Sequence, residues 1–180
     1  MNMLTWWTRL YPVRESTWWP LPLRLIVGYG FMAHGWAKLV RGPENFTGIL
    51  AALHMPFPGF LAWATILTEL IGGFAVIVGA LVPVVSLPMI IVLVVAIFTV
   101  HLSNGFSSIK LQSVDALGGA HFGQPGYETD LLYLAGIIAL VLGGPGVASV
   151  DGVLLRRKAA EVTDANRLAH MNTSARFTRS

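Results

Sequence analysis

The chain has 180 residues, of which 54% are hydrophobic and 12% are charged, with a net charge of +3 and a mean hydropathy of +0.65. Soluble domains carry about 25% charged residues, so this composition indicates a membrane protein. Most basic residues lie beside apolar stretches and form no basic face, which argues against nucleic-acid binding. The chain has no cysteine, and this excludes disulfides, thiolate nucleophiles and cysteine-ligated iron–sulfur clusters.

Four apolar stretches are predicted to form membrane-spanning helices, because about 20 residues at about 1.5 Å per residue cross the hydrocarbon core. They run approximately over residues 21–40, 57–81, 84–102 and 130–143. The fourth is short unless it continues to Val150 or tilts differently. A tight turn at Val82-Pro83 is expected between the second and third spans. The predicted fold class is therefore all-α, a polytopic bundle of four transmembrane helices over residues 21–151.

The segments that flank this membrane domain predict its orientation. Residues 1–20 are rich in tryptophan (Trp6, Trp7, Trp18 and Trp19), which favours the head-group layer. Residues 152–180 form a basic tail that is predicted to be flexible. Both flanks carry more arginine and lysine than the connections after the first and third spans, so the positive-inside rule places both termini in the cytoplasm. No A-x-A-like cleavage site follows a basic start, so the first span is expected to be retained.

Ionisable side chains interrupt the apolar spans, although such groups are costly in the hydrocarbon core. On the first span, His34 and Lys38 are four residues apart and share one helix face. Glu69 has about ten apolar or small residues on either side. On its helix face Thr65 and the pair Gly72-Gly73 are small, which indicates that the carboxylate faces another helix. The spacings Gly28-x-Gly30 and Ala75-x-x-x-Gly79 also suit close helix packing.

His101 ends the third span, and Glu128 opens the fourth from the same side. With His34, Lys38 and Glu69 they are expected to lie at the midplane or in the outer half, where they can converge on one site. Each also has a structural interpretation, as an interfacial residue at a span end or as part of a buried pair that fixes helix packing. Asp130 is interpreted as an interfacial residue or a helix cap. The histidines have no metal-like spacing within one helix, so no metal ligand is predicted.

The connection over residues 103–127 is long for a compact bundle. Its aromatic residues and histidine suggest a lid over the outer mouth, and a re-entrant or surface loop is the alternative. The residues that would form the lid are Phe106, His121, Phe122 and Tyr127.

Several short motifs follow one another between residues 21 and 151. They are Arg24 at the start of the first span, His34-Gly35-x-x-Lys38, Glu69 before Gly72-Gly73, His101 before Gly105-Phe106, Gly126-Tyr127-Glu128 before Leu131-Leu132-Tyr133, and Gly144-Pro145-Gly146-x-x-Ser149-x-Asp151. In this order and spacing the chain resembles the DoxX family, and more widely the DoxX/DoxD-like four-helix membrane proteins. Asp130 departs from the pattern as an additional acid, and the two flanking segments lie outside it.

The resemblance implies a multi-pass protein of the bacterial or archaeal cytoplasmic (inner) membrane. Some members of the family are the membrane subunit of a thiosulfate:quinone oxidoreductase, and others are associated with membrane oxidoreductase assemblies. The leading hypothesis is therefore a membrane subunit of an oxidoreductase that handles quinone or the protons coupled to it. A soluble or membrane partner protein would hold the redox centre, quinone is the implied ligand, and a homo-oligomer is one open arrangement.

In this hypothesis each polar residue has an expected role. Glu69 and His34 relay protons, because histidine titrates near neutral pH and a buried glutamate can be tuned toward it. The expected quinone- or substrate-binding residues are Lys38, Arg24, His101, Glu128 and Thr65. Two alternatives are a small-molecule or ion carrier that uses the same cluster, and a non-catalytic anchor or assembly factor that docks through its terminal segments.

Overall fold

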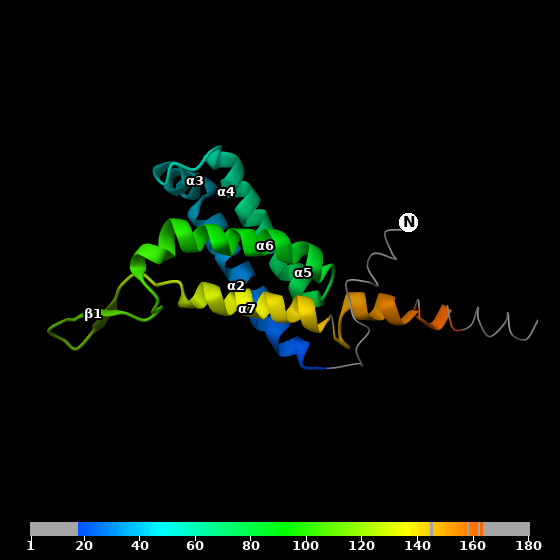
Figure 1. Cartoon of the computed structure of the whole chain (residues 1–180). Coiled ribbons are helices and arrows are strands. Elements are labelled where there is room, and N and C mark those ends of the chain that lie inside the picture. The colour runs from blue at the N-terminus through cyan, green and yellow to red at the C-terminus, as the bar shows by residue number, and fades with distance from the viewer. Residues whose placement is uncertain (1–17, 145, 158, 162, 164–180) are drawn as a thin grey trace, which may run out of the picture.

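The computed structural model describes residues 18–144, 146–157, 159–161 and 163. The described chain is mostly helical, as predicted (Figure 1). Its elements are α2 (Pro20–Arg41), α3 (Pro43–Ala52), α4 (Pro58–Leu67), the π-helical η1 (Thr68–Gly72), α5 (Gly73–Val78), α6 (Val82–Ala96), the π-helical η2 (Ile97–His101), the 3-10 turn η3 (Leu102–Asn104), β1 (Leu111–Val114), β2 (Ala120–Phe122) and α7 (Glu128–Gly143). A further helical segment covers residues 150–157 and 159–161.

The long helices pack into one bundle. Helix α2 lies against α5, η1 and α7, while α6 lies against α7, η1 and α5. The hydrophobic core between them contains residues from all four long segments, including Phe31, Val76, Met89 and Ile137. In Figure 1, α6 and α7 run side by side along the bundle, and α3 and α4 form a corner above it.

A pair of glycines sets the distance between α2 and α5. A Cβ atom at Gly28 would lie 2.5 Å from the carbonyl oxygen of Gly73, and one at Gly73 would lie 2.6 Å from that of Gly28. Real Cβ atoms do not approach backbone oxygens this closely. The close packing predicted at Gly28 is therefore confirmed, because the two backbones touch where neither residue has a side chain.

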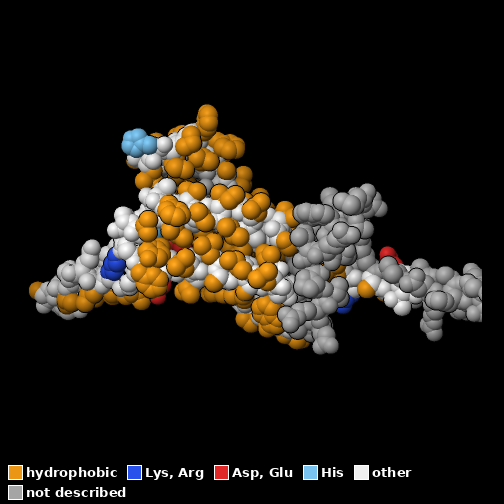
Figure 2. All heavy atoms as spheres, in the orientation of Figure 1, with side chains coloured by type: hydrophobic (Ala, Val, Ile, Leu, Met, Phe, Trp, Pro, Cys, Tyr) orange, Lys and Arg blue, Asp and Glu red, His pale blue; other side chains and the backbone are white. Residues whose placement is uncertain are grey.

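Two continuous helical stretches of the described chain, Pro58–Val78 and Val82–Asn104, are long and apolar enough to cross a bilayer, judged by length and composition alone. Helix α2 carries three arginine or lysine residues, and α7 has only 16 residues. Figure 2 shows that the visible face over α6 and α7 is almost entirely hydrophobic, with charged side chains near the two ends. Such a surface suits contact with lipid.

The connections contain structure that differs from the sequence-based expectations. The turn between α5 and α6 lies at residues 79–81 rather than at Val82-Pro83, because Gly79 and Leu81 have positive φ angles of 66° and 54° and α6 already begins at Val82. Pro83 then stands in the first helical turn, where its missing N–H costs nothing. The first connection holds helix α3, which was not predicted although Pro43 and Glu44 stand in its first turn, and which packs against α4.

Strands β1 and β2 form an antiparallel hairpin within the long connection. All of their residues are exposed, and the hairpin points away from the bundle (Figure 1). His121 and Phe122, expected in a lid, lie on exposed β2, so this part of the connection is a surface hairpin. Phe106 and Tyr127, at its base, pack edge to face with ring centroids 5.5 Å apart.

Acidification is expected to open the tip of this hairpin. The backbone N–H groups of Gly119 and Leu117 donate to the Asp115 carboxylate at 2.7 and 2.9 Å, and they hold the pKa of Asp115 below its ordinary value of 3.8. Because its pKa is lowered, the ionised Asp115 stabilises the folded tip at pH values above its ordinary pKa. This stabilisation is lost as the pH falls through the lowered pKa. Protection of the Gly119 amide against hydrogen exchange, corrected for intrinsic exchange, should fall in this range, whereas Asp115→Asn should show no such pH dependence. Equal pH profiles for the two proteins would contradict the prediction.

The terminal segments are described only in part. Trp18 and Trp19 are exposed, and Trp6 and Trp7 lie outside the described residues. The tail was predicted to be flexible from residue 152. Its described residues are helical over 152–157 and 159–161, and the rest of the prediction falls almost entirely outside the described chain.

Candidate functional site

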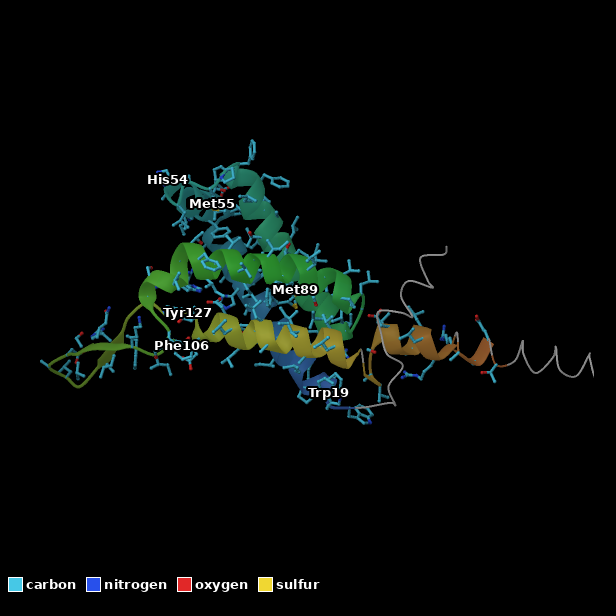
Figure 3. The ribbon with its side chains drawn as sticks, viewed as in Figure 1. Trp19, His54, Met55, Met89, Phe106 and Tyr127 are labelled. Carbon is cyan, nitrogen blue, oxygen red and sulfur yellow. The ribbon has the colours of Figure 1, made fainter. Side chains whose placement is uncertain are left out.

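A cavity of about 650 Å³ lies at the end of the bundle where α2 and α6–η2 end and where α4 and α7 begin. Most of its wall is apolar, and α3 covers one side with residues that include Phe46, Ile49 and Leu50. Figure 3 shows Met55, which lines the cavity, at the α3–α4 corner, and Phe106 and Tyr127 near the start of α7. The polar residues in the wall include His34, Lys38, Thr65, Thr68, Glu69, Thr99, His101, Thr129, Asp130 and Tyr133.

One ion pair joins α2 to η1 in this wall. The Lys38 ammonium donates to both carboxylate oxygens of Glu69, at 2.6 and 2.7 Å. The Glu69 side chain is only 6% exposed and that of Lys38 is 23% exposed. Gly35 makes room for the carboxylate side chain, because a Cβ there would lie 2.9 Å from the Cβ of Glu69. The ring of Phe46 on α3 lies 5.2 Å from the Lys38 nitrogen, so the cation also contacts the helix that covers the cavity.

A second pair joins η2 to α7. His101 Nδ1 lies 2.5 Å from Asp130 Oδ2, and the two side chains are 26% and 9% exposed. Hydrogen bonds of a histidine to a carboxylate are shorter and stronger than those between neutral groups. The pair therefore ties the end of the third long segment to the first turn of α7, on the cavity wall.

Each pair has one member on a π-helical segment. Glu69 lies in η1 and His101 is the last residue of η2. A π-turn holds one residue more than an α-turn, so it rotates the side chains that follow relative to those that precede it, and such turns are frequent at functional sites. The two local distortions thus occur where the chain presents an ionisable group to the cavity.

His34 connects the two pairs electrostatically. It lies in the cavity wall one helical turn before Lys38, and it lies within electrostatic range of Lys38, Asp130 and His101. Its side chain is exposed. The cavity therefore holds three basic and two acidic side chains from four segments of the chain, which makes it a candidate site for a ligand that combines an apolar body with polar atoms.

The DoxX family model matches residues 19–102. A relative described as an uncharacterized membrane protein of Mycobacterium tuberculosis is 30% identical over 142 residues, which cover 77% of this chain and 82% of the relative. The chain belongs to the DoxX family. It is a membrane protein that contacts the lipid bilayer. No solved structure matches the chain.

The DoxX match includes the cavity residues on the first three long segments and ends just after His101. The structure brings five of the residues singled out from the sequence to this one cavity: His34, Lys38, Thr65, Glu69 and His101. Their convergence depends on α2, α4, η1 and η2 meeting around one cavity of the DoxX bundle.

Arg24 does not line the cavity of this DoxX protein. It is 2% exposed, near the end of the bundle where α2 begins, and its guanidinium donates to the carbonyl oxygens of Val76, Ile77 and Ala148 at 3.0, 2.5 and 2.7 Å. In the same region the Asp151 carboxylate accepts from the N–H groups of Leu81 and Val82, at 3.0 and 3.4 Å. These contacts join α2, the α5–α6 turn and the segment after α7.

Glu128 is also outside the cavity wall. Its carboxylate accepts a hydrogen bond of 3.0 Å from the N–H of Ser108 and so ties the long connection to the start of α7. This contact gives Glu128 a structural function in the described chain.

Sequence reasoning missed Asp130 and Tyr133 as site residues. Both lie on α7, three residues apart, and therefore share a helix face. Asp130 is interpreted from the sequence as an interfacial residue or a helix cap, and its departure from the family pattern was the available signal. Tyr133 packs edge to face with Phe31 at a centroid distance of 5.6 Å and fills the space that Gly30 leaves free. Among the described residues, no group of three or more histidine, aspartate or glutamate side chains is arranged to hold a metal ion.

Proposed function

We propose that this DoxX protein is an integral membrane subunit of an oxidoreductase assembly and that its cavity binds a quinone. The observation that carries the proposal is a cavity of about 650 Å³ whose wall is mostly apolar and holds the Lys38–Glu69 and His101–Asp130 pairs. A quinone head group has the matching chemistry, an apolar ring with two carbonyl oxygens that accept hydrogen bonds. Ligand sites of this kind combine apolar walls with a few placed polar groups.

The polar groups have distinct roles in this proposal. Lys38 makes two contacts with Glu69, so the two opposite charges form a fixed dipole in the wall. His34 lies within electrostatic range of Lys38, Asp130 and His101, and in this proposal it relays protons, together with Glu69, to the bound head group. Reduction of one quinone consumes two protons and two electrons. The electrons come from the redox centre of a partner protein, because this chain has no cysteine and no cofactor motif.

The proposal includes four membrane spans, α2, α4–η1–α5, α6–η2 and α7, with both termini in the cytoplasm. Arg24 supports α2 as a span, because its buried guanidinium is satisfied by three carbonyl oxygens and so is not exposed to lipid. The cavity then lies in the outer half of the bilayer.

Filling the cavity is expected to weaken quinone binding. Ala96 is in the cavity wall, so Ala96→Phe places a ring in the ligand volume, whereas Ala135 is exposed on α7 and outside the wall. Binding of decylubiquinone to the protein in lipid nanodiscs, followed by quenching of tryptophan fluorescence, should weaken at least about tenfold in Ala96→Phe, which corresponds to about 1.4 kcal/mol. The matched variant Ala135→Phe should bind like the wild type.

Two results would contradict the proposal. One is that the wild-type protein binds no decylubiquinone, and the other is that both phenylalanine variants bind equally well. Uptake of a solute by liposomes that depends on Glu69, without quinone binding, would instead support a carrier. Recovery of a partner protein that depends on the tail but not on Glu69 would support an anchor.

A further inference from the structure

The geometry of the second ion pair points to a proton-linked contact with the ligand. We infer that protonated His101 donates its Nε2–H to an acceptor oxygen of the ligand in the cavity, while Asp130 holds the other ring nitrogen. This inference rests on the proposed function and assigns a role within that site to Asp130, for which the sequence predicted only an interfacial or capping position.

The contacts of the imidazole determine which nitrogen is available. Nδ1 lies 2.5 Å from Asp130 Oδ2, and a carboxylate at that distance keeps a proton on Nδ1. His101 has no other hydrogen-bond partner among the described residues, and its ring lines the cavity. Nε2 is therefore the nitrogen that meets a ligand. It donates a hydrogen bond only when the ring is protonated, because the neutral ring retains its single proton on Nδ1.

The contacts of the other ionisable groups in the cavity distinguish the effect of His101 on ligand binding from theirs. The ionisable groups that face the same cavity are His34 and Lys38 on α2, Glu69 on η1, and Asp130 and Tyr133 on α7. Lys38 and Glu69 already satisfy each other through two short contacts. His34 has no hydrogen bond or ion pair among the described residues, so no carboxylate keeps a proton on one of its ring nitrogens. His101 is thus the cavity histidine whose tautomer is fixed by a carboxylate.

The direction in which quinone binding changes with pH follows from the proton on Nε2. Loss of one proton that is needed for binding weakens binding up to tenfold per pH unit. Binding of a quinone, which only accepts hydrogen bonds, should therefore weaken as the pH rises. The corresponding quinol also has hydroxyl donors, so the neutral Nε2 can accept from it and its binding should not fall.

The experiment measures the Kd of decylubiquinone and, without oxygen, of decylubiquinol in nanodiscs between pH 5 and 8. We expect quinone binding to weaken about tenfold per unit over part of the range and quinol binding to stay level. His101→Gln should make the quinone profile flat. Asp130→Asn removes the negative charge that favours the protonated ring, so it should bind quinone more weakly than the wild type at the same pH.

The exposed hairpin supplies a matched control. His121 and Asp115 also form a histidine–aspartate contact, at 3.3 Å, but both lie outside the cavity. His121→Gln should leave the profile unchanged. The inference would be overturned if quinone binding by the wild type did not depend on pH, or if His101→Gln kept the pH dependence. In either case, quinone binding that weakens in Ala96→Phe would still support the proposed function. Absence of quinone binding at every pH would overturn both.

Discussion

Replacement of Lys38 by methionine is expected to destabilise the bundle by about 3–5 kcal/mol, because it leaves the Glu69 carboxylate buried without its cation. Glu69 is only 6% exposed, and Lys38 binds both of its oxygens. Methionine retains much of the length and apolar volume of lysine, so the loss reports mainly the missing charge. The measurement is unfolding by sodium dodecyl sulfate in mixed micelles, followed by tryptophan fluorescence.

The double variant Lys38→Met/Glu69→Gln distinguishes the charge effect from packing. It removes both charges, so most of the stability lost in Lys38→Met should return. Arg41→Met is the matched control, because Arg41 is an exposed basic residue three positions further along α2. It should change stability by no more than about 0.5 kcal/mol. Equal stability of the single and double variants would show that Lys38 does not neutralise Glu69.

Replacement of Arg24 by lysine should be the second large perturbation, although it keeps the positive charge. The guanidinium bridges three carbonyl oxygens on two separate parts of the chain, through Nε, Nη1 and Nη2. A lysine has one terminal nitrogen and no fork, so it cannot reproduce these contacts. Hydrogen bonds to charged groups contribute about 1.5–3 kcal/mol each, and we expect a loss of about 3 kcal/mol or more in the same unfolding assay.

Arg156 is a control for Arg24, because it bonds to the carbonyl oxygen next to the one on Ala148. It is exposed and donates one hydrogen bond of 2.9 Å to the carbonyl oxygen of Val147. Arg156→Lys should therefore change stability by no more than about 0.5 kcal/mol. If Arg24→Lys changed stability as little as Arg156→Lys, the hydrogen bonds of Arg24 would not stabilise the packing of α2 against α5 and the segment after α7. Quinone binding by the folded fraction of Arg24→Lys should match the wild type, because Arg24 lies outside the cavity wall.

The sequence by itself determined that the chain has the composition of a membrane protein, approximately where the long helices lie, and on which helix face several polar residues stand. These features depend on local patterns. Apolar runs separated by proline and glycine mark the helices to within a few residues. The spacing of His34 and Lys38 places them on one face, and the small residues near Glu69 indicate that it packs against a neighbouring helix.

Only the tertiary structure decided which polar groups meet. The pairing of Lys38 with Glu69 depends on how α2 lies against η1, and the Gly28–Gly73 contact sets that approach. His101 and Asp130 are 29 residues apart, and an exposed hairpin lies between them, so no local pattern specifies their contact. The π-turns also rotate Glu69 and His101 by an amount that helical periodicity does not contain.

Arg24 is the clearest example of what the sequence determines and what the tertiary structure determines. Its position near the start of an apolar span was evident from the sequence, and a ligand-binding role was predicted from its charge. Its burial between α5 and the segment after α7 instead lets the guanidinium donate three hydrogen bonds to backbone carbonyl oxygens. Local sequence thus determines that a helix carries a charge at a given depth. The rotation and register of the packed helices determine whether that charge meets a ligand, another side chain or the backbone.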